Sequence, residues 1–447
     1  MARSPAYFRP ASGWRVKPFR MYTEFDAAMK MAALACTGSE RGIHMRRRRF
    51  LGLGAAAGLA LAQNKQIDEV TATATQDTTP RVGIVLSSFK QGAEHDGTEI
   101  RGLDDPRPPD ADLTSTQIDA MVRRAIDLAA TRAGDFASMV EPEDWVVVKT
   151  HISSCYGLTS ETKDGGAPPP YIPGSVADPR IVRSVVSYLA EQKRGLRFTI
   201  VEGSAQWLPA ERSKSPVDGW TTEWGGAFDG LSYRKMIEDL TRRFPKVRFE
   251  IADLNFAESI ELPVPGKAFA RNNPSGVYSI PKVIQQCDRV ISVAPMKTDS
   301  TAGVSLSVKN YLGIAPGSKY GFPKDGLLKL GSPDEVMIDL FSYHPADFAI
   351  VVGGWGVEGD GPDGPGASSV HHNIAIAGVK AICVDAVAAS IMGFNPSGLP
   401  FLTLGDQKGF GIFEVDSIWT RGNDIDEARR NFRKPSRWRP PGPNTKA

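Results

Sequence analysis

Two patterns of apolar residues alternate along the chain. Short uninterrupted apolar runs predict buried strands, and apolar residues that recur every three or four positions predict amphipathic helices. Strands are expected at 82–86, 145–148, 198–201, 247–251, 289–294, 348–352 and 373–377. Helices are expected at 116–133, 178–192, 233–244, 303–312 and 380–392. The alternation predicts an α/β protein with a layered, largely parallel sheet flanked by helices.

The strand and helix pattern extends over residues 81–427 and is long enough for two lobes. Proline and glycine cluster between residues 255 and 280, so we expect a first α/β lobe at 81–260 and a second at 261–427. Residues 63–80 are polar and threonine-rich and are predicted to be a linker. Residues 428–447 are rich in arginine and proline and are predicted to be a loose tail.

The N-terminal region has the pattern of a targeting signal. Four arginines follow Met45, the apolar run 50–62 comes next, and Ala60-Leu61-Ala62 ends it with the small residues of a cleavage site. This pattern resembles a twin-arginine signal peptide at 45–62 and predicts a periplasmic protein exported by the twin-arginine machinery. Residues 1–44 would then be an upstream extension or a mis-assigned start. The alternative is a basic patch before a buried helix.

Composition narrows the possible functions. Among 447 residues, 53 Lys+Arg nearly balance 51 Asp+Glu, which argues against nucleic acid as a partner. No apolar run approaches about 18 residues, so we expect no transmembrane segment. The four cysteines are far apart and form no CxxC pair, so we expect no cysteine-ligated iron–sulfur cluster.

Ionisable residues directly follow several of the predicted strands. Lys149 and His151 follow one strand, Glu202 the next, and Lys297 and Asp299 another. Ligands of open α/β sheets bind beyond the carboxyl ends of the strands, so these residues predict a polar cleft for a small anionic substrate. Lys149, Lys297 and His151 are the candidate catalytic residues, and His151 is the best candidate for proton transfer. The alternatives are solvated lysines and a hydrogen-bonded structural histidine.

The segment after Lys297 is a second candidate for anion binding. It is rich in hydroxyls and precedes the helix expected at 303–312, and a helix N-terminus attracts anions. Lys309 and Asn310 lie off the apolar face of that helix. We expect them to bind substrate together with Asp299 and Glu202, although Lys309 and Asn310 could be ordinary surface residues.

The loop 353–366 combines seven glycines with Glu358, Asp360 and Asp363. Closely spaced carboxylates suit a hard divalent cation such as Mg²⁺ or Ca²⁺. These three residues are therefore the candidate metal ligands. The alternative is a tight turn whose acids are solvated.

Six segments together resemble the domain of unknown function 362 family. They are VVVKTHIS (146–153), DPRIVRSVVSYLAEQ (178–192), VISVAPMKTD (290–299), VSLSVKNYLG (304–313), GGWGVEGDGPDGPG (353–366) and VDAVAASIMGFNP (384–396). The resemblance covers roughly residues 145–400. Some members carry ferredoxin-like cysteine motifs, which this chain lacks, and many have Lys-Pro-Asn where this chain has Lys149-Thr150-His151. The site positions that the resemblance implies are Lys149, Lys297, Lys309, Asn310, Glu358, Asp360 and Asp385.

Two functions fit these features. The first is an exported enzyme whose cleft binds a small anionic substrate and a divalent cation, with Lewis-acid chemistry as one option. The alternative is a periplasmic protein that binds a ligand or matures a cofactor without turnover.

Overall fold

The computed structural model describes residues 80–93, 99–130, 136–152, 171–204, 227–361, 364 and 366–440. The predicted upstream extension, the predicted signal peptide and the predicted linker up to residue 79 lie outside these residues. No helix among the described residues has the length and apolar character needed to cross a membrane.

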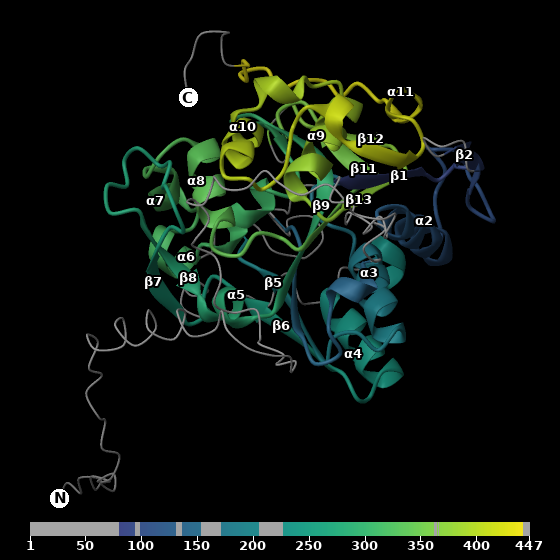
Figure 1. The fold of residues 1–447 in the computed structure, drawn as a ribbon, viewed down its shortest axis with the longest axis horizontal. Coiled ribbons are helices and arrows are strands. Elements are labelled where there is room, and N and C mark those ends of the chain that lie inside the picture. The colour runs from purple at the N-terminus through teal and green to yellow at the C-terminus, as the bar shows by residue number, and fades with distance from the viewer. Residues whose placement is uncertain are drawn as a thin grey trace, which may run out of the picture. The chain divides into compact units, whose positions relative to one another are not determined.

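A sheet of ten strands forms the centre of the described part of the chain (Figure 1). Eight strands follow one another in the order β14-β1-β13-β11-β9-β4-β5-β6, while β10 pairs with β9 and β12 with β11. The run from β11 to β6 is parallel throughout, and β13 is antiparallel to both of its neighbours. The strands are β1 (Arg81–Leu86), β4 (Trp145–Lys149), β5 (Arg197–Glu202), β6 (Arg248–Asp253), β9 (Arg289–Asp299), β10 (Gly303–Ser305), β11 (Phe348–Glu358), β12 (Ser368–His371), β13 (Ile374–Gly378) and β14 (Trp419–Gly422). The predicted α/β class with a largely parallel sheet is confirmed.

Helices cover both faces of this sheet. One apolar core joins one sheet face to α2 (Ser115–Leu128), α3 (Pro179–Glu191) and α4 (Tyr233–Arg243). A second core joins the other face to α8 (Pro333–Phe341), α9 (Ala381–Ile391) and α10 (Pro400–Gln407). Side chains alternate between the faces of a strand, so adjacent residues enter different cores. Val147 belongs to the second core and Val148 to the first.

The helix predicted at 178–192 forms for the expected local reasons. The Asp178 side chain accepts a hydrogen bond from the Arg180 amide, and Pro179 occupies the first turn, where a missing amide hydrogen costs nothing. The apolar face of α3 then packs against α2 and α4. This start also fixes where the Arg180 side chain lies relative to the sheet edge.

The helix predicted at 303–312 is wrong. Gly303 begins strand β10, which turns back along β9, and the 3-10 helix η3 (Lys309–Ile314) follows. Gly303 has a φ of +81°, and its Cα lies against the Trp438 indole, where a side chain would clash. The apolar spacing predicted the helix, but this backbone conformation and close contact favour a tight hairpin.

Strands from both sides of the lobe boundary expected near residue 260 belong to the same sheet. Strand β9, from the predicted second lobe, lies between β4 of the first and β11. Residues 72–447 form one compact unit. The predicted lobes therefore share a single sheet.

Residues 428–440 are not a loose tail. Phe432 and Trp438 are buried in the second core, and the main chain of this segment bonds to Ile391 and Met392 at the end of α9. The spaced aromatic residues bury enough apolar surface to hold the segment in place. Residues 441–447 lie outside the described part of the chain.

Smaller elements complete the fold. They are the pair β2 (Gln91–Ala93) and β3 (Glu99–Arg101), the pair β7 (Ser259–Pro263) and β8 (Val277–Pro281), the helices α5 (Lys282–Gln286), α6 (Gly317–Tyr320), α7 (Asp325–Leu328) and α11 (Ile425–Ala428), and the 3-10 helices η1 (Ala137–Met139), η2 (Ala227–Gly230), η4 (Pro396–Gly398) and η5 (Val415–Ser417).

Candidate functional site

Polar side chains gather where the central parallel strands end. Strand β4 lies between β5 and β9, and its last residue, Lys149, pairs in register with Val201 and Ser292. Helix η3 brings Asn310 against the same strand end, because the Asn310 amide nitrogen donates to the carbonyl of Lys149 and to the hydroxyl of Ser292. Residues more than 150 positions apart thus meet at one sheet edge.

Lys149 is fully buried, and its ammonium group is held by three acceptors. The Nζ atom lies 2.7 Å from Glu202 Oε1, 2.7 Å from Asn310 Oδ1 and 2.6 Å from the Thr150 carbonyl oxygen. Burial lowers the pKa of Lys149, while the adjacent Glu202 carboxylate favours the charged form. An ion pair this deep is stable only when hydrogen bonds satisfy both partners.

The Glu202 carboxylate meets that requirement. Its Oε1 atom also accepts the Gly203 amide at 2.7 Å, and its Oε2 atom accepts the Ile152 amide. Gly313 packs against the ion pair so closely that an added Cβ would stand 2.6 Å from Lys149 Nζ. A glycine is therefore needed here for steric reasons.

His151 lies beside a second buried lysine. Its Nε2 atom is 2.6 Å from Lys297 Nζ, which also donates to the Ser175 carbonyl oxygen at 3.1 Å. Burial, followed by the ammonium groups of Lys297, Lys149 and Lys309, holds the pKa of His151 well below its usual value. The ring is therefore neutral near pH 7, and if Lys297 donates to Nε2, the ring proton sits on Nδ1. His151 is half-buried, whereas Lys297 is only 1% exposed.

Lys309 forms an ion pair with Asp299, with 2.8 Å between Nζ and Oδ2. Burial would raise the pKa of Asp299, but Lys309 and hydrogen bonds from Thr301 and Ala302 outweigh it and hold the pKa well below its usual value. Asp299 thus stays ionised and matches the charge of Lys309.

Lys324 was not identified from the sequence. Its Nζ atom donates to the Gly203 carbonyl oxygen at 2.6 Å and to the Gly313 carbonyl oxygen at 3.3 Å. Burial lowers the pKa of Lys324 to about 7. Lys324 precedes the short helix α7 and follows no strand of the sheet, so the search at strand ends could not find it.

These contacts define a group that we call the lysine cluster. Its members are joined by direct hydrogen bonds or ion pairs, by the ammonium groups around His151, or, for Lys324, by its electrostatic interactions with Glu202 and Lys149. They are Lys149, His151, Glu202, Lys297, Asp299, Lys309, Asn310 and Lys324. Every residue predicted for the anionic substrate belongs to this cluster.

Asp385 lies apart from the cluster and caps a backbone turn. Its carboxylate accepts the Ser307 and Val308 amides, each at 2.9 Å, and the Ser307 hydroxyl. Burial raises the pKa of Asp385 to about 7. Its role in the described structure is to hold the chain that leads into η3.

Two of the predicted metal ligands lie at the end of β11, where Glu358 is its last residue, and just after it, where Asp360 follows; both contact the C-terminal segment. Glu358 accepts the Ser368 hydroxyl and the Arg433 amide, and Asp360 accepts the Ser436 amide and hydroxyl. The described residues contain no group of three histidine, cysteine, aspartate or glutamate side chains arranged to hold a metal. The third predicted ligand, Asp363, lies outside the described residues.

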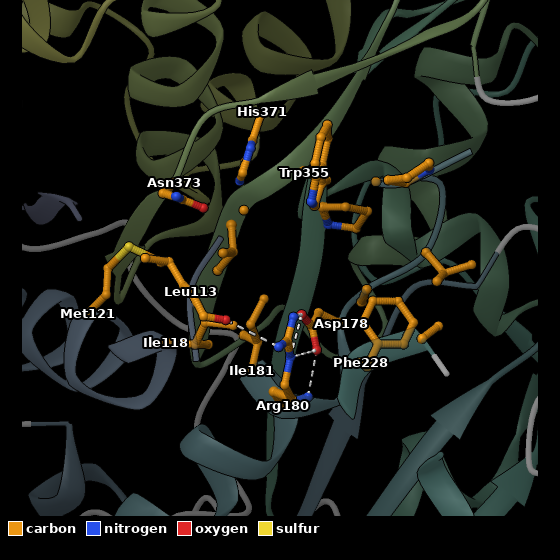
Figure 2. A pocket seen from close by; sticks show the side chains of 18 of the residues that line it. Leu113, Ile118, Met121, Asp178, Arg180, Ile181, Phe228, Trp355, His371 and Asn373 are labelled. Carbon is orange, nitrogen blue, oxygen red and sulfur yellow. Dashed lines mark hydrogen bonds and ion pairs between the residues drawn. The ribbon is translucent and has the colours of Figure 1, made fainter. Parts of the chain in front are cut away.

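A cavity of about 400 Å³ lies between the sheet and the start of α3, and Figure 2 shows side chains that line it. It is lined by the middle of β9 and of β11, by the start of α3 and by the segment before α3. Ser175, whose carbonyl accepts Lys297, lies between two lining residues, Gly174 and Val176. The cavity lining includes no residue predicted from the sequence as part of the site.

A family profile matches the part of the chain that contains most of these residues. The profile described as "Domain of unknown function (DUF362)" matches residues 162–390, slightly more than half of the protein. The chain belongs to the DUF362 family. No curated protein sequence matches it.

Solved structures show only distant similarity to this DUF362 protein. The lactate racemase apoprotein of Thermoanaerobacterium thermosaccharolyticum has 13% identity and a TM-score of 0.28 over 63% of this chain and 58% of that one. A Thermotoga maritima protein has 11% identity and a TM-score of 0.29 over 66% and 59%. This chain thus spans less than two thirds of either structure, and no functional argument rests on them.

Proposed function

We propose that this DUF362 protein is an enzyme that binds a small carboxylate or phosphate compound at the lysine cluster and moves a proton with His151. The contact between His151 and Lys297 carries the proposal. In this contact a neutral imidazole lies against an ammonium group near the carboxyl ends of parallel strands, where α/β proteins bind their ligands.

Charge favours an anion at this place. Glu202 matches Lys149 and Asp299 matches Lys309, whereas Lys324 has a pKa of about 7 and bonds to two carbonyl oxygens, so a nearby anion would favour its protonated, charged form. Interactions between charges strengthen in surroundings with few water molecules. An incoming anion would therefore be attracted to this part of the sheet edge.

An anion would also change the protonation of His151. The neighbouring ammonium groups help to hold the pKa of His151 down, and a negative charge beside the ring would offset them. The pKa would rise, and His151 would take up a proton as the anion binds. That proton is then available for the substrate.

The buried lysines have a different part in this scheme. Lys149 and Lys297 are almost fully buried and bonded to protein groups, so they are positioning residues that act on the ligand through His151 and the surrounding charge. His151 is the candidate catalytic residue, because its imidazole is neutral and can take up or release a proton near neutral pH.

Calorimetry tests the binding step. Phosphate and acetate are titrated at pH 7 in two buffers of different ionisation enthalpy. We expect binding with proton uptake that is lost in His151→Gln and kept in Lys246→Met, which replaces an exposed lysine in the turn between α4 and β6. Absence of anion binding, or binding whose heat is the same in both buffers, contradicts the proposal.

A turnover assay separates the enzyme from the alternative of binding alone. Small carboxylates and phosphate esters are incubated with the protein in D₂O and followed by NMR for deuterium incorporation and new products. Turnover that disappears in His151→Gln, while anion binding survives at a lower affinity, supports the enzyme. Anion binding with no change in any compound favours the protein without turnover.

Export is a separate proposal that rests on residues 45–62 alone. Arg47→Lys with Arg48→Lys should keep the protein in the cytoplasm of a host that has twin-arginine machinery. Accumulation of this variant in the periplasm, at the level of the unaltered protein, would contradict twin-arginine export.

A further inference from the structure

The cavity beside the lysine cluster is lined mainly by apolar groups. Residues of α2 and α3 supply aliphatic side chains, β9 and β11 supply one wall, and Phe228 lies across from them (Figure 2). At about 400 Å³, the cavity falls within the size range of sites for small organic ligands. The aliphatic lining residues are Leu113, Ile118, Met121, Val176, Ile181, Val293 and Val352.

Two stacked rings form one side of this cavity. Trp355 and His371 are directly paired between β11 and β12, with ring centroids 4.0 Å apart and an interplanar angle of 11°. Trp355 is 40% exposed, which is unusual for so large an apolar side chain. The pair offers a flat aromatic surface that a ligand ring could cover.

A buried hydroxyl group also lines the cavity. The Tyr171 oxygen is buried, and no hydrogen bond of good geometry reaches it from the described residues. Burial raises the pKa of this phenol, so the hydroxyl keeps its proton and can donate. A buried polar group without a partner is unfavourable, and a ligand atom that accepts or donates here would remove that cost.

Charge in the cavity differs from charge in the lysine cluster. The Arg180 guanidinium is bonded twice to Asp178, and its NH1 lies 3.1 Å from Asp229 Oδ2. Asp112 on the rim is exposed, and burial lowers the pKa of His371, so that ring is neutral. The lining thus contains one arginine and three aspartates, which disfavours a second anion.

We propose that this cavity binds a flat nitrogen heterocycle, uncharged or cationic, which stacks on Trp355 and forms a hydrogen bond with the Tyr171 hydroxyl. The site goes beyond the anion-binding function and does not depend on it. Because Gly174 and Val176 flank the carbonyl that accepts Lys297, a ligand held here would lie next to the lysine cluster.

Three probes test ring shape and charge separately. Tryptamine is flat and cationic, 2-cyclohexylethylamine is cationic but not flat, and indole-3-acetate is flat but anionic. We expect tryptamine to bind with a Kd on the order of a millimolar, as its size allows, and each of the others at least about tenfold more weakly. Equal affinity for all three, or no tryptamine binding up to about 10 mM, overturns the proposal.

Two variants assign the binding to this cavity. Trp355→Leu should weaken tryptamine binding about tenfold or more. Trp419→Leu replaces a half-buried tryptophan of β14 that stacks on Arg81 of β1, and it should leave tryptamine binding unchanged. If Trp355→Leu binds tryptamine as tightly as the parent does, tryptamine binds somewhere other than this cavity, and the proposal is contradicted.

Tyr171→Phe gives the sharpest result, because folding and binding should change in opposite directions. The variant removes a buried hydroxyl that has no hydrogen-bond partner of good geometry among the described residues, so the free protein should be as stable as the parent or more stable. Binding of adenine, whose ring nitrogens can accept the Tyr171 hydrogen bond, should weaken several-fold. Adenine binding that is absent in the parent, or unaffected by the variant, overturns the assigned hydrogen bond.

The outcomes remain distinct from those of the anion-binding proposal. Lys297→Met and His151→Gln leave the cavity lining intact, so they should not alter the binding of tryptamine by more than about twofold. Loss of phosphate binding with retained tryptamine binding would count against the anion site alone.

Discussion

The lysine cluster and the loop 353–366, which we call the acidic loop, begin from the same kind of sequence and end in opposite surroundings. Both place charged residues near the carboxyl end of an apolar strand. In the cluster, Lys149 is fully buried and its carboxylate partner comes from another strand. In the acidic loop, Asp360 bonds to Ser436 at the surface and Glu358 bonds to the backbone of Arg433.

The difference comes from what covers each strand end. Strand β4 lies in the interior of the sheet, and η3 packs over its end, so its charges are removed from water and need internal partners. In the acidic loop, by contrast, Glu358 ends β11 and Asp360 follows it, and their carboxylates bond to Ser368 and to Arg433 and Ser436 of the C-terminal segment. A charge after a buried strand therefore indicates a functional site only when other elements enclose it.

The largest expected effect is on stability in the cluster. Lys149→Met leaves the Glu202 carboxylate buried without its ion-pair partner, so the free energy of unfolding should fall by about 3–5 kcal/mol. Urea unfolding measures it. In the acidic loop, Arg433→Ala removes a long, partly exposed ion pair with Glu358 and should cost less than about 1 kcal/mol.

A double variant provides the control for that comparison. Lys149→Met with Glu202→Gln removes both charges. The free energy of unfolding lost in this double variant should be smaller than the sum of the losses in Lys149→Met and in Glu202→Gln. If Lys149→Met costs no more than Arg433→Ala, the two regions are energetically alike and the distinction between them fails.

The next effect is a pH dependence caused by Lys324. Burial lowers its pKa in the folded protein to about 7, and an unfolded lysine has a pKa near about 10.4. Between these values the unfolded chain holds one more proton, so stability should rise with pH, by up to about 1.4 kcal/mol per unit. Urea unfolding between about pH 7 and 9.5 measures the slope.

Lys324→Met should flatten this slope, because the methionine cannot titrate. Lys319→Met, an exposed lysine in the neighbouring helix α6, should leave the slope unchanged. The same slope in Lys324→Met and the parent would mean that Lys324 stays charged in the folded protein.

A smaller effect concerns the pKa of His151. Lys297→Met removes the nearest ammonium group, so the pKa of His151 should move up toward its ordinary value while burial still holds it below that value. NMR of the His151 ring through a pH titration measures the shift. A pKa that does not change in Lys297→Met would show that Lys297 does not control the ring.

The smallest effect is expected for divalent cations at the acidic loop. Protein donors already occupy the described oxygens of Glu358 and Asp360, so Mg²⁺ or Ca²⁺ should leave the Tm unchanged. A rise in Tm that disappears in Glu358→Gln with Asp360→Asn would instead support the predicted cation site and make the two regions more alike.

The sequence by itself determined the strands of the parallel core and the helices α2, α3, α4 and α9. Continuous apolar runs predicted every strand of the parallel core, and Asp178 with Pro179 marked the start of α3. These features depend on local spacing and capping, which a single sequence displays directly. It also identified Lys149, Glu202 and Lys297 as candidate site residues, because ligands of open α/β sheets bind beyond the carboxyl ends of the strands.

Only the tertiary structure decided which of these residues meet and what surrounds them. The contact of Lys149 with Asn310 depends on the hairpin at Gly303, where spacing alone predicted a helix. Lys324 belongs to the lysine cluster, and the cavity beside the cluster forms, because segments that are distant in sequence fold against the same part of the sheet. Burial depends on packing between residues that are distant in sequence, and burial in turn controls the protonation of His151. A local sequence pattern cannot predict that packing.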